Sequence, residues 1–385
     1  MLIPVSPFLG ARLLVAMVIL VILTGRLRIQ DLILNSWDLL FFCALLVLGM
    51  VYTSDTKAGL GVLETSFGLI GTPIALSSVR QFDRHKVIRL LGFFYGGVLF
   101  GGLICLINAS IQYYDMHDIN LFFFHNLTGV INSHPTYFAY FLILAITFAL
   151  YVATYEDSIK KTLVGATSGF CFILLLLTGG LTAFVSLLYV ISFFMLKFLL
   201  SGRSPTRFMV FALSLIMLVT IILVNSSDTS NRQNALDDSW DRFELWTSAI
   251  KASPDFIFGV GTGGHRKILN DYYVSHSHPE WAKENMNAHN QFIQTSLTHG
   301  ILGLLALLII LLRPIYLALR RNDQFGILAI FPFLIYGITE VFLGRFQGVV
   351  FFAMVHQLFI RHYMYSDCSI EVKPSASSLP DQFAK

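Results

Sequence analysis

The chain has 385 residues, of which 55% are hydrophobic and 13% are charged, and its mean hydropathy is +0.69. Soluble domains carry about 25% charged residues, so this composition excludes an ordinary soluble protein. The formal net charge is only +3, which gives no indication of a nucleic-acid partner. Of the four cysteines, three lie inside apolar runs, a pattern that favours neither a disulfide framework nor a paired-cysteine metal site.

Apolar stretches of about the length that a spanning helix needs follow one another along the chain. They cover residues 8–24, 36–53, 60–79, 88–112, 135–154, 161–178, 181–199, 207–225, 291–312, 326–343 and 347–363. Lipid cannot satisfy open backbone groups, so we expect helices throughout. The prediction is an all-α polytopic membrane bundle of about 11–12 transmembrane helices with one large outer loop. We expect the first stretch to be a span rather than a cleaved signal peptide.

The polar segments divide this bundle into four parts. We expect residues 1–225 to form the N-terminal spans, 226–290 a large loop with the site, 291–363 the last three spans, and 364–385 a disordered cytoplasmic tail. Most lysines and arginines fall in one set of alternate loops, which is typical of the cytoplasmic side. The N-terminus and the large loop would then lie outside, and Gly179-Gly180 would join two spans in a tight hairpin.

The large loop contains the polar motifs. A glycine-rich stretch runs from Gly259 to Gly264, and it could either turn the chain or present backbone amides to a phosphate. His276 and His278, together with His265, could bind zinc, but no cysteine or carboxylate has the spacing of a further ligand. We therefore expect no metal.

Two residues stand at the boundary between polar and apolar sequence. His289 lies where the loop becomes a membrane helix, so it could be functional or a hydrogen-bonded capping residue. Glu340 is the acidic residue of its span, near the outer end, and we expect it to contribute to the site or to pair with Arg345 or Arg12. Glu64 is a weaker candidate.

Three motifs in order resemble the O-antigen ligase/polymerase family. They are Arg242-(x)3-Trp246, then Gly259-Val260-Gly261-Thr262-Gly263 after Pro254, and finally His289-Asn290 followed by Gly300-Ile301-Leu302-Gly303. Those proteins have a periplasmic loop between late membrane helices that ends in a His-Asn pair. The motifs cover roughly residues 160–310. This sequence differs from the family's pattern at one segment, Thr178-Gly179-Gly180-Leu181-Thr182. The family commonly has an arginine there that faces the active site, and this segment has none.

The resemblance implies a GT-C-like, inverting and metal-independent glycosyltransferase in the bacterial inner membrane, with its active site facing the periplasm. It would move a glycan from undecaprenyl diphosphate to an acceptor hydroxyl, either on lipid A-core in a ligase or on another glycan in a polymerase. His289 would be the catalytic base and Arg242 a diphosphate ligand, with Arg266 or Arg345 replacing the missing arginine. We expect no cofactor. The predicted substrate-binding residues are Arg242, Arg266, Asn287, Asn290, His265, Glu340 and Arg345.

Two functions of other classes compete with this interpretation. A flippase or another transporter of lipid-linked oligosaccharides would concentrate charged residues in several spans and show repeat symmetry. A structural or sensor protein would not explain the clustering of histidine and arginine in one loop. The sequence favours the transferase, which requires His289 and Arg242 to converge.

Overall fold

Helices form all the regular structure in residues 3–79, 82–155, 161–200 and 242–371, the part of the chain that the computed structural model describes. This confirms the all-α prediction. In chain order the elements are α1 (Pro7–Leu23), α2 (Ile29–Leu48), α3 (Thr56–Ser66), α4 (Gly68–Ser77), α5 (Arg84–Met116), η1 (Ile119–Phe122), α6 (Phe124–Thr128), η2 (Gly129–Ile131), α7 (Pro135–Tyr155), α8 (Lys161–Thr178), α9 (Leu181–Leu200), α12 (Gly264–Ser275), α13 (Pro279–Glu284), α14 (Gln291–Arg320), α15 (Gln324–Thr339), η3 (Phe342–Gly344) and α16 (Phe346–Glu371).

The predicted spans coincide with helices wherever the structure describes them. Five segments are long and apolar enough to cross a membrane, namely α2, α3 with α4, α5, α7 and α14, and four shorter apolar helices accompany them. Stretch 207–225 lies outside the described residues. Helix α16 continues to Glu371, past the predicted end of the last span, and residues 372–385 of the predicted tail are not described. Gly179, with φ of 65°, lies in the short connection between α8 and α9, and both helices pack against α7.

Helix α7 lies at the centre of the bundle. It is apolar all round, and 78% of the residues in its apolar 18-residue segment are buried, as expected for a helix surrounded by others. Its Tyr140 ring stacks on Tyr336 of α15 with centroids 4.2 Å apart. Phe351 of α16 meets Tyr140 edge-on at 5.1 Å, so α7, α15 and α16 share one aromatic core. This core fixes the end of α15, beyond which Glu340 lies.

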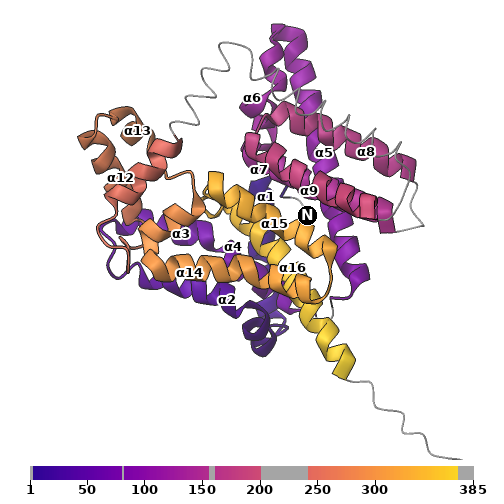
Figure 1. Cartoon of the computed structure of the whole chain (residues 1–385), viewed down its shortest axis with the longest axis horizontal. Helices are drawn as coiled ribbons and strands as arrows, with labels where there is room; N and C mark the ends of the chain where they lie inside the picture. Colours follow the sequence, from indigo (N-terminus) through magenta and orange to yellow (C-terminus); the bar gives the residue numbers. More distant parts are fainter. Residues whose placement is uncertain (1–2, 80–81, 156–160, 201–241, 372–385) are drawn as a thin grey trace, which may run out of the picture.

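The described part of the predicted loop is a small helical unit rather than irregular chain. Residues 242–252 form a helix, and α12 and α13 follow it. Leu245, Leu269, Tyr273 and Trp281 are buried together as a separate apolar cluster. The unit packs against α3 and α14, beside which α12 and α13 stand in Figure 1. Residues 226–241 lie outside the described part.

A kink in α14 receives the glycine-rich turn. Gly300 has φ of 60° and ψ of −156°, and a Cβ at this position would overlap the carbonyl oxygen of Ile257. The amides of Val260 and Gly261 donate to the carbonyl oxygens of Leu297 and Thr298 at 3.0 and 2.9 Å. Since an unkinked helix would use those carbonyls internally, the kink and the turn stabilise one another.

A buried ionic network joins α2, α14 and α16. Asp38 is 1% exposed and contacts Arg313 Nη1 at 2.9 Å and His356 Nε2 at 3.0 Å. Gln357 accepts from Ser36 at 3.0 Å, and from Arg361 at 3.3 Å. Arg313 directly follows the predicted span 291–312 and Arg361 lies near the end of the predicted span 347–363, and both side chains enter the bundle. Buried charges persist in proteins only when they are compensated: Asp38 and Arg313 form an ion pair, and Arg361 donates to Gln357 and to the carbonyl oxygen of Pro73.

Candidate active site

His289 is held by the turn that begins α14. Its backbone lies in the left-handed region, with φ of 41°, which a non-glycine residue adopts at a cost of about 1 kcal/mol or more. The Asn287 side chain accepts from the His289 amide at 2.8 Å, and Gln294 accepts from the Ala288 amide at 3.1 Å. Asn290 caps α14 by accepting from Phe292 and Ile293, so its oxygen has a structural role. These bonds set the direction of the His289 ring.

Glu340 brings His289 and Arg242 together. It lies just beyond the end of α15, outside the spanning helix, in an extended conformation. Its Oε2 lies 3.5 Å from His289 Nδ1, and its Oε1 lies 3.6 Å from Arg242 Nη2. Arg242 also donates to the carbonyl oxygen of Thr339 at 2.7 Å. Three segments far apart in sequence thus meet at one carboxylate, and we refer to His289, Glu340 and Arg242 as the catalytic cluster, after the role that we propose for them below.

The charges in this cluster are complementary. Burial alone would raise the pKa of Glu340, but the His289 contact and the Arg242 guanidinium outweigh it, so the pKa lies below its usual value. Glu340 is therefore an anion at neutral pH. A carboxylate beside Nδ1 favours the tautomer with the proton on that atom, which leaves the lone pair on Nε2 available as a base. The 3.5 Å separation is long for a hydrogen bond, as catalytic contacts often are without substrate.

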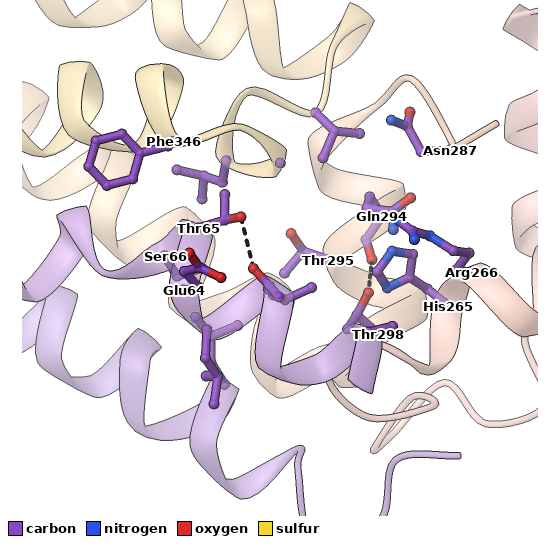
Figure 2. A pocket seen from close by; sticks show the side chains of 18 of the residues that line it. Glu64, Thr65, Ser66, His265, Arg266, Asn287, Gln294, Thr295, Thr298 and Phe346 are labelled. Carbon is purple, nitrogen blue, oxygen red and sulfur yellow. Dashed lines mark hydrogen bonds between the residues drawn. The ribbon is translucent and has the colours of Figure 1, made fainter. Parts of the chain in front are cut away.

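A cavity of about 1320 Å³ adjoins the catalytic cluster. Asn287, Gln291 and Val341 line it, and these residues lie one or two positions from His289 or Glu340. Figure 2 shows His265 and Arg266 at one end with Gln294 and Thr298, and Glu64 and Phe346 at the other. Helices α1 and α2 provide an apolar wall. The cavity is therefore amphipathic and large enough for a lipid headgroup with attached sugar.

The predicted site residues fall into separate groups. Arg242, His289 and Glu340 form the catalytic cluster, whereas His265, Arg266 and Asn287 line the cavity. Arg345 is exposed beyond η3 and does not line the described cavity. Glu340 pairs with neither of the expected partners, because Arg242 and His289 occupy its two oxygens and Arg12 lies over the Phe8 ring.

The glycine-rich turn has a structural role. A phosphate would need its backbone amides, but those of Gly259, Val260, Gly261, Thr262 and Gly264 all donate to protein carbonyl oxygens. Gly263, with φ of 92°, approaches the backbone of Gly59 too closely for any side chain. The phosphate interpretation of these amides is therefore wrong, and the glycines instead let the turn pack between α2, α3 and α14.

The segment without the family's arginine lies beside the catalytic cluster. Thr182, at the start of α9, shares a hydrogen bond of 2.7 Å with the hydroxyl of Thr339, the residue whose carbonyl accepts from Arg242. Thr182 cannot supply charge. Arg266 lies in the adjoining cavity, and it is the better placed of the two predicted replacements.

Several cavity residues escaped the sequence analysis. Gln291, Gln294, Thr295 and Thr298 line the cavity from α14, and His299 joins them. The sequence did contain an indication of this polar face, because Gln294, Thr295 and Thr298 follow Gln291 by three, four and seven residues. These spacings place side chains on one face of a helix. A polar stripe in an apolar helix is typical of a helix that faces a polar cavity or partner. Glu64 lines the same cavity, although it was the weaker candidate.

The stability of the chain should depend on His265. Burial, with Arg266 as the smaller cause, lowers the pKa of His265 from 6.5 to about 4. The unfolded chain then binds more protons between these values, so the contribution is full above pH 6.5 and is lost as the pH falls toward about 4. We expect the melting temperature in detergent to fall over this window, and to fall less in His265→Gln. His276→Gln is the control, since that ring is exposed; equal pH dependence in both variants would contradict the assignment.

A family of known proteins resembles a part of the chain that includes two residues of this site. Residues 166–308 match the family model described as O-antigen ligase. An uncharacterized protein from Haemophilus influenzae is 26% identical over 151 residues, an alignment that spans 36% of this chain and 37% of that protein. The predicted resemblance is therefore confirmed: this chain is O-antigen ligase-like over residues 166–308, which include both Arg242 and His289.

Proposed function

We propose that this chain is a glycosyltransferase of the bacterial inner membrane that moves a glycan from undecaprenyl diphosphate to an acceptor hydroxyl. The preferred acceptor is lipid A-core, which makes it a ligase, with the active site facing the periplasm. The observation that carries the proposal is the meeting of His289 and Arg242 at Glu340, next to a large amphipathic cavity.

The proposed reaction uses His289 as a general base. Nε2 of His289 takes the proton of the acceptor hydroxyl as its oxygen attacks the anomeric carbon of the donor sugar. The new glycosidic bond forms while the bond from that carbon to the diphosphate oxygen breaks, and the diphosphate leaves with the electron pair. Attack from the face opposite the leaving group inverts the anomeric centre. Glu340 stabilises the imidazolium that results.

Arginine is suited to the leaving group. Its guanidinium is always charged and can bind phosphate oxygens through two parallel hydrogen bonds. Arg242 is partly exposed, with 33% of its side-chain surface accessible, so it can reach a donor without leaving Thr339. Arg266 lines the cavity and would bind a second phosphate oxygen. We propose that these two cations take the place of a divalent metal.

The test is transfer by the purified full chain in detergent, with undecaprenyl-diphosphate-linked oligosaccharide, lipid A-core and EDTA. Glycan on lipid A-core supports a ligase, and longer carrier-linked chains support a polymerase. Carrier movement across a vesicle bilayer without transfer would support a flippase, to which the buried charges around Asp38 would also be suited.

Arg242→Gln should lower the rate of transfer by about 10²-fold, because one stabilising charge at the diphosphate is lost. Lys251→Gln is the matched control, since Lys251 lies on the same helix, is exposed and should not change the rate. The rate is measured as glycan transferred per minute under saturating donor. Equal rates for the two variants would contradict a role for Arg242 at the leaving group.

A further inference from the structure

An exposed apolar turn projects from the small helical unit of the predicted loop. It consists of Phe256-Ile257-Phe258, which we call the apolar tip, and it connects the helix of residues 242–252 to the glycine-rich turn. Each of its three residues is 58% exposed, although each has a large hydrophobic side chain. Adjacent exposed side chains of this kind are unfavourable in water and mark a surface that contacts a membrane or another apolar partner.

Backbone polar groups of the apolar tip are bonded within the protein. The Asp255 carboxylate accepts from the amides of Ile257 at 2.7 Å and Phe258 at 3.4 Å. The carbonyl oxygens of the first and last tip residues accept from the Ile301 amide and the Tyr52 hydroxyl, each at 2.8 Å. Backbone that is not part of a regular helix can enter lipid only where such groups find partners in the protein. These bonds therefore make the tip compatible with an apolar environment.

The same bonds place the apolar tip beside the exposed surfaces of α2 and α14, two helices that are long and apolar enough to cross a membrane. Ile301 directly follows the kink of α14, and both Ile301 and Leu302 are exposed there. Next to Tyr52, Leu48 and Val51 are exposed at the end of α2 and just beyond it. The exposed apolar faces of spanning helices contact lipid, so the tip continues a surface that lipid covers.

The kink at Gly300 marks the level at which α14 changes from polar to apolar. Before it, the polar stripe from Gln291 to Thr298 lines the large cavity, whereas residues 301–312 contain no polar side chain. Such a change is expected where a spanning helix passes from the polar boundary of the bilayer into the hydrocarbon. The tip bonds to α14 at this change. Interfacial segments bury Phe and similar side chains about 5–10 Å into the boundary between headgroups and acyl chains.

We propose that the apolar tip inserts into the interface of the lipid bilayer and anchors the helical unit of the loop to the membrane surface. The tip follows the helix that contains Arg242, so insertion holds this helix at a fixed height relative to the lipid. The anchor is a contact with bulk lipid and not with a substrate, so it does not depend on the proposed transfer reaction.

The test is fluorescence quenching of the full chain in phosphatidylcholine nanodiscs. A nitrobenzoxadiazole label is attached to Ile257→Cys in a chain that also carries Cys368→Ser. The described cysteines are buried, and buried thiols are inert toward such labels. Lys267→Cys with the same label is the matched control, because Lys267 is an exposed residue of α12 in the same unit. This control also accounts for the affinity of the label itself for lipid.

Two quenchers report the surroundings of the label. We expect a nitroxide on the lipid acyl chain to quench the Ile257 label severalfold more than the Lys267 label. Iodide in the buffer should quench the two labels in the reverse order. For the Ile257 label, a nitroxide near the headgroup end of the chain should quench more than one near the methyl end, because the tip lies at the interface.

Two outcomes would overturn the proposal. Equal quenching of the Ile257 and Lys267 labels by iodide would leave the tip in water. Protection of the Ile257 label from both quenchers would show that protein, such as a second copy of the chain, covers the tip. Phe258→Cys provides a second labelled site, and melting temperatures identify a variant that does not fold. Since phosphatidylcholine carries no glycan, the quenching reports lipid contact without turnover and is independent of the transfer assay.

Discussion

His289→Ala is expected to lower the rate of glycan transfer by about 10²–10⁴-fold while leaving the chain folded. The imidazole is the group in the catalytic cluster with a nitrogen lone pair, and Glu340 directs that free nitrogen away from the carboxylate. Alanine removes the base but keeps the Asn287 and Asn290 bonds that shape the turn, since those bonds involve backbone amides. The measurement is single-turnover transfer from the lipid-linked donor.

Controls separate the loss of a base from a structural change. His276→Ala should transfer at the rate of the unaltered chain, because His276 stacks on Tyr272 away from the cavity. Glu340→Gln should also lower the rate, since a neutral amide no longer stabilises the imidazolium. If the two residues act as a unit, the double variant His289→Ala/Glu340→Gln loses little more than His289→Ala alone. Full activity in His289→Ala would exclude this histidine as the base.

Hydropathy was sufficient to predict the helices of the bundle, and polar residues at the ends of apolar runs drew attention to two of the three residues that meet at Glu340. Apolar runs of spanning length have few alternatives to a helix, so the described helices of the bundle followed from composition, whereas α12 and α13 of the predicted loop did not. His289 and Glu340 were conspicuous because each is a polar residue at the edge of an apolar run. Arg242 was predicted through the family resemblance, since nothing in its local sequence marks it.

The pairing of residues could not be predicted. Hydropathy does not show which helices are neighbours, so the sequence did not indicate that Arg242 rather than Arg345 contacts Glu340. Asn290 was taken for a binding residue because its role as a cap depends on where α14 begins. The glycine-rich stretch was compatible with either a turn or a phosphate site, and the kink at Gly300 explains why two of its amides donate to the carbonyl oxygens of Leu297 and Thr298.

Asp38 is the clearest case of a residue whose role depends on distant partners. It lies near the start of an apolar run, and the residues that neutralise it, Arg313 and His356, belong to the last third of the chain. The predicted span ends at residue 312, so Arg313 falls in the loop that follows it. Its burial, with 14% of the side chain exposed, shows instead that a charge near the end of a membrane helix can turn inward.

Asp38→Ala should therefore lower the free energy of unfolding by about 3–5 kcal/mol, because it leaves Arg313 and His356 buried without their acceptor. Asp31→Ala is the matched control on the same helix. Asp31 pairs with Arg28 at 3.4 Å on a partly exposed surface, where an ion pair contributes about 1 kcal/mol or less. Unfolding is followed by sodium dodecyl sulfate titration in mixed micelles, and equal midpoints for the two variants would contradict the assignment.

The contribution of the network to stability can be tested by replacing Asp38, Arg313 and His356 together by apolar residues. Replacing a buried ionic group by apolar residues of similar size is often neutral, whereas breaking it is costly. The triple variant Asp38→Leu/Arg313→Met/His356→Leu should therefore unfold at a higher detergent fraction than Asp38→Ala alone. Helices α2 and α14 also line the large cavity, so the network can affect transfer through the scaffold. A scaffold role predicts that the transfer rate falls together with stability in Asp38→Ala and that both recover in the triple variant. A triple variant that is stable but inactive would instead give these charges a direct part in moving the substrate.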